Sequence, residues 1–216
     1  MQVVAVSVGA LQDVKNRRGV MLRTGIGKSP VTGRVWMGEL GLAGDAQGNL
    51  KVHGGPDGAV YLYSADHYPL WQAEEGRTFP YGQFGENLTV TGIREDAVWI
   101  GDVFRVGGAE VQVTQPRIPC ATLGLRMGDA KFPDRFLASR RNGFYLRVLQ
   151  TGEVGAGDAF TRQSRGAEGM SVREAVDLLY GEGGPRERLE LLGRTAALSE
   201  RWRPQVAKRL RLLAAE

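Results

Sequence analysis

A single cysteine ends a stiff stretch of chain, Gln115-Pro-Arg-Ile-Pro-Cys120. Two prolines flank Arg117 and restrict the backbone that leads to the sulfur atom. The following residues predict a helix from Ala121, which places Cys120 at a helix N-terminus, where the dipole favours the thiolate. This pattern is typical of a nucleophilic or metal-binding cysteine. The residues leave a second interpretation open, because a lone cysteine is commonly a small buried hydrophobic residue.

Two glycine-rich regions carry groups suited to binding anions. In the first, Gly41-Leu-Ala-Gly-Asp45 is followed by Lys51-Val-His-Gly-Gly-Pro-Asp57. This region predicts tight turns with exposed N–H groups, and His53 stands at the start of the tightest turn. In the second, Arg23-Thr-Gly-Ile-Gly-Lys28, the hydroxyl of Thr24 lies between two cations. The second region matches neither the P-loop nor the dinucleotide-binding pattern, so an exposed basic turn explains it equally well.

The sequence offers little support for other kinds of binding or catalytic site. Asn87, in Phe84-Gly-Glu-Asn-Leu88, precedes a predicted strand and is either a ligand contact or a turn-stabilising residue. The one cysteine and two histidines include no local ligand pair that would nucleate a zinc site. A serine hydrolase is disfavoured because the chain has no G-x-S-x-G elbow. A single cysteine also cannot hold an iron–sulfur cluster.

Short β-rich runs separated by glycines would position these residues. Their spacing predicts a mostly β (α+β) fold, a barrel or sandwich in place of alternating βαβ units. Asp102, Gly107-Gly108 and Gly152 are expected as turns between strands. The predicted strands are Val3–Val8, Arg34–Met37, Val60–Tyr63, Leu88–Val90, Val98–Ile100, Val103–Val106, Glu110–Thr114 and Phe144–Leu149.

Helices are predicted in two parts of the chain. Within the β-rich part, one helix follows Ser64 as N-cap and extends to Glu75, and another covers 121–139 with a break near Pro133. In the tail, Ser171-Val-Arg-Glu174 is a capping-box sequence that begins the first of three short amphipathic helices. The predicted organisation is therefore a domain over 1–162, a linker over 163–169 and a three-helix extension over 170–216.

Composition narrows the class of protein. The chain has 216 residues, of which 42% are hydrophobic and 24% charged, values ordinary for a chain with a packed core. No run of about 18 uncharged apolar residues is present, and the first residues predict a strand instead of a signal peptide. We therefore expect a cytoplasmic protein without a membrane partner. The net charge of +4 comes without a dense basic run, which disfavours binding to nucleic acid polymers.

Taken together, these blocks resemble the MOSC family, the C-terminal domain of molybdenum-cofactor sulfurases, which also occurs as a stand-alone bacterial protein. The resemblance spans nearly all of residues 1–160, and the tail resembles the three-helix extension of the YiiM-like subgroup, notably at Leu198-Ser-Glu-Arg-Trp202. The blocks that carry the resemblance are Gly41-Leu-Ala-Gly-Asp45, Val52-His-Gly-Gly-Pro-Asp57, Asp66-His-Tyr68, Phe84-Gly-Glu-Asn-Leu88, Ile100-Gly-Asp102 and Gln115-Pro-Arg-Ile-Pro-Cys120.

The resemblance implies a MOSC-type, barrel-like domain that binds the molybdenum cofactor. It makes Cys120 the catalytic residue and the molybdenum ligand, and thiolate is a suitable soft ligand for that metal. It also implies that cationic and polar side chains surround the anionic pterin phosphate or oxo groups. These cofactor-binding residues are Arg23, Thr24, Lys28, His53, Asn87 and Arg117.

The YiiM-like subgroup is associated with reductive detoxification of N-hydroxylated bases such as 6-hydroxylaminopurine. The resemblance therefore implies a molybdenum-dependent reductase of N-hydroxylated compounds that receives electrons from a separate redox protein. Two other functions stay open: a sulfur carrier with a persulfide on Cys120, and a module that binds or delivers the cofactor without turnover. The family is also associated with pyridoxal phosphate binding.

The short tail helices bury little surface on their own. We expect them to pack either against the β domain or against a second copy of the chain. The second arrangement would make a homodimer.

Overall fold

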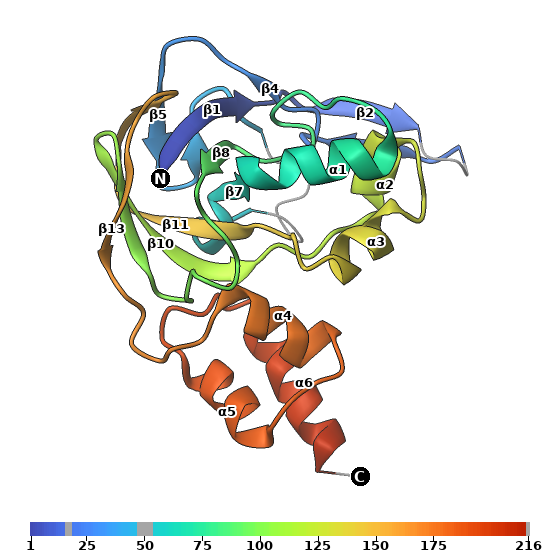
Figure 1. Ribbon diagram of the computed structural model, residues 1–216, viewed down its shortest axis with the longest axis vertical. Helices are drawn as coiled ribbons and strands as arrows, with labels where there is room; N and C mark the ends of the chain where they lie inside the picture. The colour runs from blue at the N-terminus through green and yellow to red at the C-terminus, as the bar shows by residue number, and fades with distance from the viewer. Residues whose placement is uncertain (16–18, 47–53, 215–216) are drawn as a thin grey trace.

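The structure is a computed structural model that describes residues 1–15, 19–46 and 54–214. Within these ranges a β-rich body stands above a helical C-terminal segment (Figure 1). The body is built on an eight-stranded sheet with the order β13-β9-β10-β11-β7-β8-β1-β4. Neighbouring strands of this sheet are antiparallel except for the parallel pair β7–β8. Its strands are β1 (Gln2–Val8), β4 (Ser29–Pro30), β7 (Val60–Ser64), β8 (Leu88–Thr91), β9 (Val103–Val106), β10 (Ala109–Pro116), β11 (Phe144–Gln150) and β13 (Phe160–Ser164).

The two sides of this sheet approach each other through backbone hydrogen bonds. The N–H of Val3 donates to the carbonyl of Asp158 (2.9 Å), and the N–H of Phe160 donates to the carbonyl of Met1 (3.0 Å). These bonds join β1 to the chain around the start of β13 and close the sheet into a barrel-like body, which confirms the predicted fold class. Two smaller sheets complete it, formed by β12 (Gly152–Gly155), β5 (Arg34–Gly38) and β6 (Gly41–Leu42), and by β2 (Gln12–Lys15) and β3 (Met21–Thr24).

Alternation along the strands explains why the body folds this way. In β10, Ala109, Val111 and Val113 are buried while the residues between them are partly exposed, so one face of the strand supplies the core. A second, aromatic cluster packs among β7, α1 (Tyr68–Glu75), α2 (Ala121–Met127) and α3 (Phe132–Ala138). Its fully buried members include Trp71, Phe84 and Phe136. This cluster fixes the start of α2, and thereby Cys120, against the body.

The C-terminal segment packs directly on the body. It contains α4 (Val172–Tyr180), α5 (Arg186–Arg194) and α6 (Arg203–Leu213), which lie below the sheet in Figure 1. Val172 of α4, Leu192 of α5 and Val206 of α6 belong to the same hydrophobic cluster as Val111 of β10. Of the two packing arrangements expected for the tail, the structure shows the one against the β domain. Strand β13 continues through Ser164, two residues into the predicted linker.

Three local predictions need correction. Val98–Ile100 does not form a strand, because the N–H of Trp99 donates to Asp102 Oδ2 (3.1 Å) and the carbonyl of Trp99 accepts from the N–H of Asp102 (3.0 Å), which makes a turn. Within 121–139 the helix breaks earlier than expected, because Gly128 ends α2 in the left-handed region (φ 73°). Pro133 instead lies in the first turn of α3, where a missing N–H is tolerated.

The sequence predicts a turn at Gly152, but this residue is the first of β12 and pairs with Met37 of β5. A Cβ at this position would lie 2.3 Å from the carbonyl carbon of Gly108. Close approach of two backbones, and not a turn, is therefore what requires glycine here.

Within the described ranges, no helix has the length and apolar character needed to cross a membrane.

Candidate functional site

A cavity of about 220 Å³ opens on the body where β3, the start of α2 and the ends of β7 and β11 meet. The structure brings six of the sequence-predicted site residues to its wall, although they are spread over about 100 positions of the chain. These are Arg23, Thr24, Lys28, Asn87, Arg117 and Cys120. The seventh, His53, lies outside the described residues, whereas its neighbours Gly54 and Gly58 line the cavity.

Cys120 occupies the N-cap position of α2, as the sequence predicts. Its backbone is extended (φ −124°, ψ 172°), and its carbonyl accepts the hydrogen bond from the N–H of Leu123 (3.0 Å). The segment between β10 and α2 is held to the body by a hydrogen bond from the N–H of Arg117 to the carbonyl of Gly143 (3.1 Å). The side chain of Cys120 is half-buried on the cavity wall, so it is not the fully buried hydrophobic residue of the alternative interpretation.

Arg117 is the most unusual side chain in the cavity. The residue is only 5% exposed, and its guanidinium lies over the rings of Tyr61 and Phe136, 5.5 and 5.3 Å from their centroids. Its Nη1 atom is buried and has no hydrogen-bond partner. An unpaired buried N–H of a cation carries a desolvation cost of several kcal/mol, which an anionic ligand in the cavity would remove.

Lys28 reaches the cavity as part of a buried polar network. Its ammonium pairs with Asp45, whose carboxylate also accepts hydrogen bonds from the N–H of Gly9 (2.9 Å) and from Asn87 Nδ2 (2.9 Å). Burial lowers the pKa of Lys28, and the attraction of Asp45 opposes that shift. Asn87 Oδ1 in turn accepts from the N–H of Tyr61 (3.1 Å). The amide of Asn87 therefore ties three segments together as well as facing the cavity.

Arg23 and Thr24 arrive at the cavity on β3, the second strand of a small hairpin. Thr24 Oγ1 accepts a hydrogen bond from the N–H of Ile26 (3.2 Å), which turns the chain toward the cavity. A Cβ at Gly25 would lie 1.8 Å from the carbonyl oxygen of Ala46, so only glycine allows this approach. Arg23 is exposed at the rim, where its charge faces any ligand that enters.

Polar residues of the cavity wall that the sequence does not predict as site residues include Asp45, Tyr61 and Tyr145. The two tyrosines are cross-strand partners in β7 and β11, with ring centroids 5.3 Å apart. Burial raises the pKa of both phenols, with Arg117 opposing the shift, so they stay neutral hydroxyl groups at pH 7. Asp45 could have been predicted, because a buried lysine requires a nearby counter-charge. The pairing of the two tyrosines could not, because it depends on strand register, which no short motif reveals.

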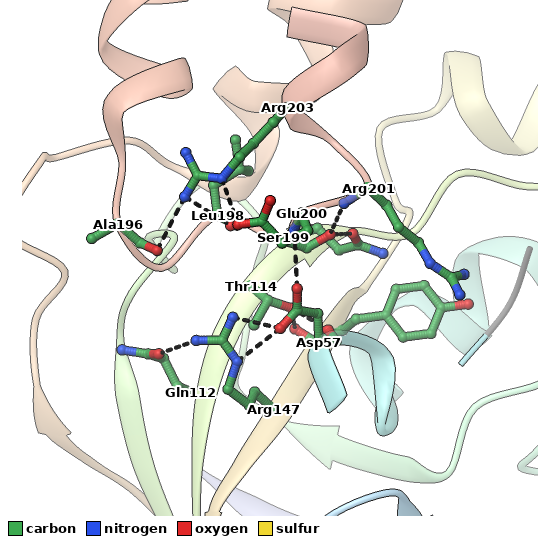
Figure 2. A network of polar contacts seen from close by, with 12 residues as sticks. Asp57, Gln112, Thr114, Arg147, Ala196, Leu198, Ser199, Glu200, Arg201 and Arg203 are labelled. Carbon is green, nitrogen blue, oxygen red and sulfur yellow. Dashed lines mark hydrogen bonds and ion pairs between the residues drawn. The ribbon is translucent and has the colours of Figure 1, made fainter. Parts of the chain in front are cut away.

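Asp57, the last residue of the His-Gly-Gly-Pro-Asp motif, does not line the cavity and points toward the C-terminal segment (Figure 2). Its carboxylate accepts from Arg147 Nε (2.9 Å) and from the N–H of Glu200 (3.0 Å). Its carbonyl accepts from Thr114 Oγ1 (2.6 Å). One glycine-rich motif therefore lines the cavity with its glycines and holds the extension with its aspartate.

Comparison with known proteins agrees with this architecture. The model of the MOSC domain family matches residues 49–161, and that of the YiiM-like, 3-alpha helix domain matches residues 170–212. The chain is 41% identical over 191 residues to the uncharacterized protein YflK of Bacillus subtilis, covering 88% of this chain and 86% of YflK. A protein named reductase from Gibberella moniliformis is 34% identical over 155 residues, which are 70% of this chain and 28% of that protein.

Among solved structures, YiiM from Geobacillus stearothermophilus superposes with a TM-score of 0.82 at 31% identity, covering 97% of this chain and 98% of that chain. With this coverage the match includes both the body and the three helices. On the family models, the relatives and the fold together, this chain belongs to the MOSC family and carries the YiiM-like three-helix domain.

Proposed function

We propose that the cavity binds the molybdenum cofactor and that the protein reduces N-hydroxylated compounds there. The observation that carries the proposal is the pairing, on one wall, of an accessible thiol with a buried arginine nitrogen that lacks a partner. A soft sulfur ligand suits the metal, and cationic donors suit the anionic pterin phosphate and oxo groups. Both halves of the cofactor therefore find matching chemistry in this donor set.

Different residues of the cavity are proposed to bind the metal and the anionic groups of the cofactor. Cys120 is proposed as the metal ligand and catalytic residue, and its backbone is fixed by the N-cap of α2. Arg117, Lys28 and Arg23 supply positive charge, and the hydroxyl of Thr24 can donate to a ligand. The hydroxyl of Tyr61 already donates to the carbonyl of Asn142 (2.8 Å) and so serves to hold the cavity wall. The tight contact of Gly25 with Ala46 forms the wall against which the ligand would lie.

When bound, the cofactor would supply the exchange of two electrons with the substrate. The overall reaction takes a hydroxylamine, two electrons and two protons to an amine and water, with the N–O bond broken. The electrons come from a separate redox protein, since a single cysteine cannot hold an iron–sulfur cluster. The name of the Gibberella relative, reductase, supports the same class of chemistry. The proposal keeps the cytoplasmic location expected from the sequence, with neither nucleic acid nor membrane as partner.

Pyridoxal phosphate fits the cavity less well. That cofactor requires a lysine amine to form a Schiff base. Lys28 lines the cavity, but its amine is held in the buried ion pair with Asp45.

Metal and pterin analysis of protein expressed in a molybdate-replete host tests the proposal. We expect near-stoichiometric molybdenum in the wild-type chain, its loss in Cys120→Ser, and its retention in the control Thr122→Ser, a conservative change in the same cavity. Wild-type protein should also reduce a hydroxylaminopurine when supplied with a chemical reductant. Equal molybdenum in wild type and Cys120→Ser would overturn the role of Cys120.

The same samples separate the two alternatives. Absence of metal together with cyanide-labile sulfur that disappears in Cys120→Ser would indicate a sulfur carrier, a function that the partial exposure of Cys120 permits. Bound pterin without turnover would indicate a delivery module. A homodimer stays a prediction, and gel filtration of the full chain checks it.

A further inference from the structure

A buried histidine–glutamate pair, His67 and Glu95, has no part in the proposed function and does not line the cavity. Nε2 of His67 lies 3.1 and 2.9 Å from the two carboxylate oxygens of Glu95. Oε1 of Glu95 also accepts a hydrogen bond from the N–H of Gly143 (2.8 Å). A buried carboxylate that is bonded on both sides is held in one orientation. Glu95 therefore fixes the backbone at Gly143.

Gly143 and the residue before it hold two residues of the cavity wall. The carbonyl of Gly143 accepts from the N–H of Arg117 (3.1 Å), and the carbonyl of Asn142 accepts from the hydroxyl of Tyr61 (2.8 Å). The guanidinium of Arg117 in turn lies over the ring of Tyr61, 5.5 Å from its centroid. Two adjacent carbonyls therefore place both the arginine and the ring against which it packs.

The bond between Gly143 and Glu95 is costly to lose. Gly143 adopts the left-handed conformation (φ 66°), and a Cβ at this position would lie 2.3 Å from the carbonyl oxygen of Leu62. The side chain of Asn142 does not hold the segment, since neither of its polar atoms has a hydrogen-bond partner among the described residues. Without the carboxylate of Glu95, the buried N–H of Gly143 would lack its acceptor, and the segment would move to find another.

Glu95 is itself fixed by the C-terminal segment. Its carbonyl accepts from the N–H of Arg173 in the first turn of α4 (3.0 Å). Three residues further on, the carbonyl of Val98 accepts from the N–H of Val172 (2.9 Å). These bonds set the position of Glu95, and the contact with His67 sets the orientation of its carboxylate.

We propose that Glu95, oriented by His67, is a positioning residue for the guanidinium of Arg117. Its bond to Gly143 sets the backbone of Arg117 and the ring of Tyr61, so that the unpaired Nη1 stays directed to a ligand in the cavity. A donor that is already ordered binds more tightly, because binding no longer has to order it. The inference rests on the proposed function only in taking Arg117 as a residue that receives an anionic group of the ligand.

Calorimetric titration of the full chain with inorganic phosphate, at constant ionic strength against chloride, tests the inference. Glu95→Ala should weaken phosphate binding about tenfold, because the guanidinium is no longer held in the binding geometry. Glu95→Gln keeps an acceptor for the N–H of Gly143 and should stay within about twofold of the wild type. Asp96→Ala is the matched control, since it removes an exposed carboxylate from the next residue and should bind phosphate as the wild type does.

A double-mutant cycle shows whether Glu95 acts through Arg117. Arg117→Met removes the guanidinium and should weaken phosphate binding about thirtyfold. Adding Glu95→Ala to Arg117→Met should weaken binding by less than about twofold more, because the group that Glu95 positions is already absent. A merely structural role for Glu95 would instead lower the affinity by the same factor in both backgrounds.

Four results would overturn the inference: no phosphate binding by the wild type beyond that of chloride, equal affinity in wild type and Glu95→Ala, as large a loss in Asp96→Ala or Glu95→Gln as in Glu95→Ala, or full additivity with Arg117→Met. Thermal unfolding of each variant verifies the fold. If Glu95→Ala does not fold, Glu95→Asp takes its place in the cycle, since its shorter side chain draws the carboxylate away from Gly143 and should weaken binding about threefold. None of these readouts depends on molybdenum or turnover, so failure of the proposed function and failure of this inference are distinguishable.

Discussion

Two aspartates that follow glycine-rich turns organise different regions of this molecule. Asp45 lies beside the cavity, where it and Lys28 expose only 4% and 8% of their side chains. Asp57 lies at the junction with the C-terminal segment, where it and Arg147 expose 22% and 28%. Each aspartate accepts a backbone N–H in addition to its ion pair. The difference in burial decides what each pair contributes, because water screens the second pair and not the first.

The largest effect is expected at the buried pair. Asp45→Asn leaves the ammonium of Lys28 buried without its counter-charge and should lower the free energy of unfolding by about 3 kcal/mol. Urea unfolding at pH 7 measures the loss. The double variant Lys28→Met/Asp45→Asn removes the charge as well as its partner and should recover much of the stability. If Asp45→Asn lowered the free energy of unfolding by less than about 1 kcal/mol, the ammonium of Lys28 would be solvated in another way, and burial would not explain the difference between the two ion pairs.

At the junction the effect should be smaller and confined to one region. Asp57→Asn weakens the pair with Arg147 and the bond from the N–H of Glu200, which together predict a loss of about 1.5 kcal/mol. Hydrogen exchange should accelerate in α4–α6 more than in the body, because this aspartate joins the two. Uniform acceleration throughout the chain would contradict a local docking role for Asp57.

The sequence predicted the elements of both regions better than their partners. Alternating apolar residues identified β10, and the lone cysteine that follows two prolines identified the wall of the cavity, because such signals lie within a few residues of each other. Asp45 and Lys28 are 17 positions apart, and Asp57 and Arg147 are 90 apart. Which aspartate faces the cavity depends on how strands pair, and strand register has no signal in a single short motif.

At two positions the local sequence predicts the wrong element. Asp102 accepts the N–H of Gly166 (2.8 Å) as well as that of Trp99, and so turns an apolar run away from the strand it predicts. Gly152 suggested a turn but serves a close approach of strands. At Gly152 a contact distant in sequence overrides the local preference, whereas the turn at Val98–Ile100 comes from the pairing of Trp99 with Asp102, three residues away.

The pH dependence of stability sharpens the comparison further. Burial holds the pKa of Lys28 below its ordinary value of 10.5, so between those two values the unfolded chain binds more protons than the folded chain. The contribution of Lys28 to the free energy of unfolding therefore rises with pH in that window. Asp45→Asn should lower the pKa further and extend the rise to lower pH, by about 1.4 kcal/mol for each unit of pKa.

Urea unfolding between pH 7 and 10 measures this effect. The double variant Lys28→Met/Asp45→Asn is the control, because it keeps the buried tyrosines and lacks the lysine. Identical pH profiles for Asp45→Asn and the double variant would exclude Lys28 as the titrating group.

The smallest effect is expected at the start of the extension, where the capping box is only half formed. Ser171 Oγ accepts from the N–H of Glu174 (3.0 Å), but the carboxylate of Glu174 pairs with Arg188 of α5 (2.6 Å). Glu174 therefore joins two helices, and Ser171 alone caps α4. Ser171→Ala should cost about 1 kcal/mol, whereas Ser171→Asp should stay close to wild type because aspartate caps equally well. Since the cap lies at the start of α4, Ser171→Ala should accelerate hydrogen exchange in α4 and leave exchange in the body unchanged. Equal acceleration in the body would show that the contribution of the Ser171 cap is not local to the extension.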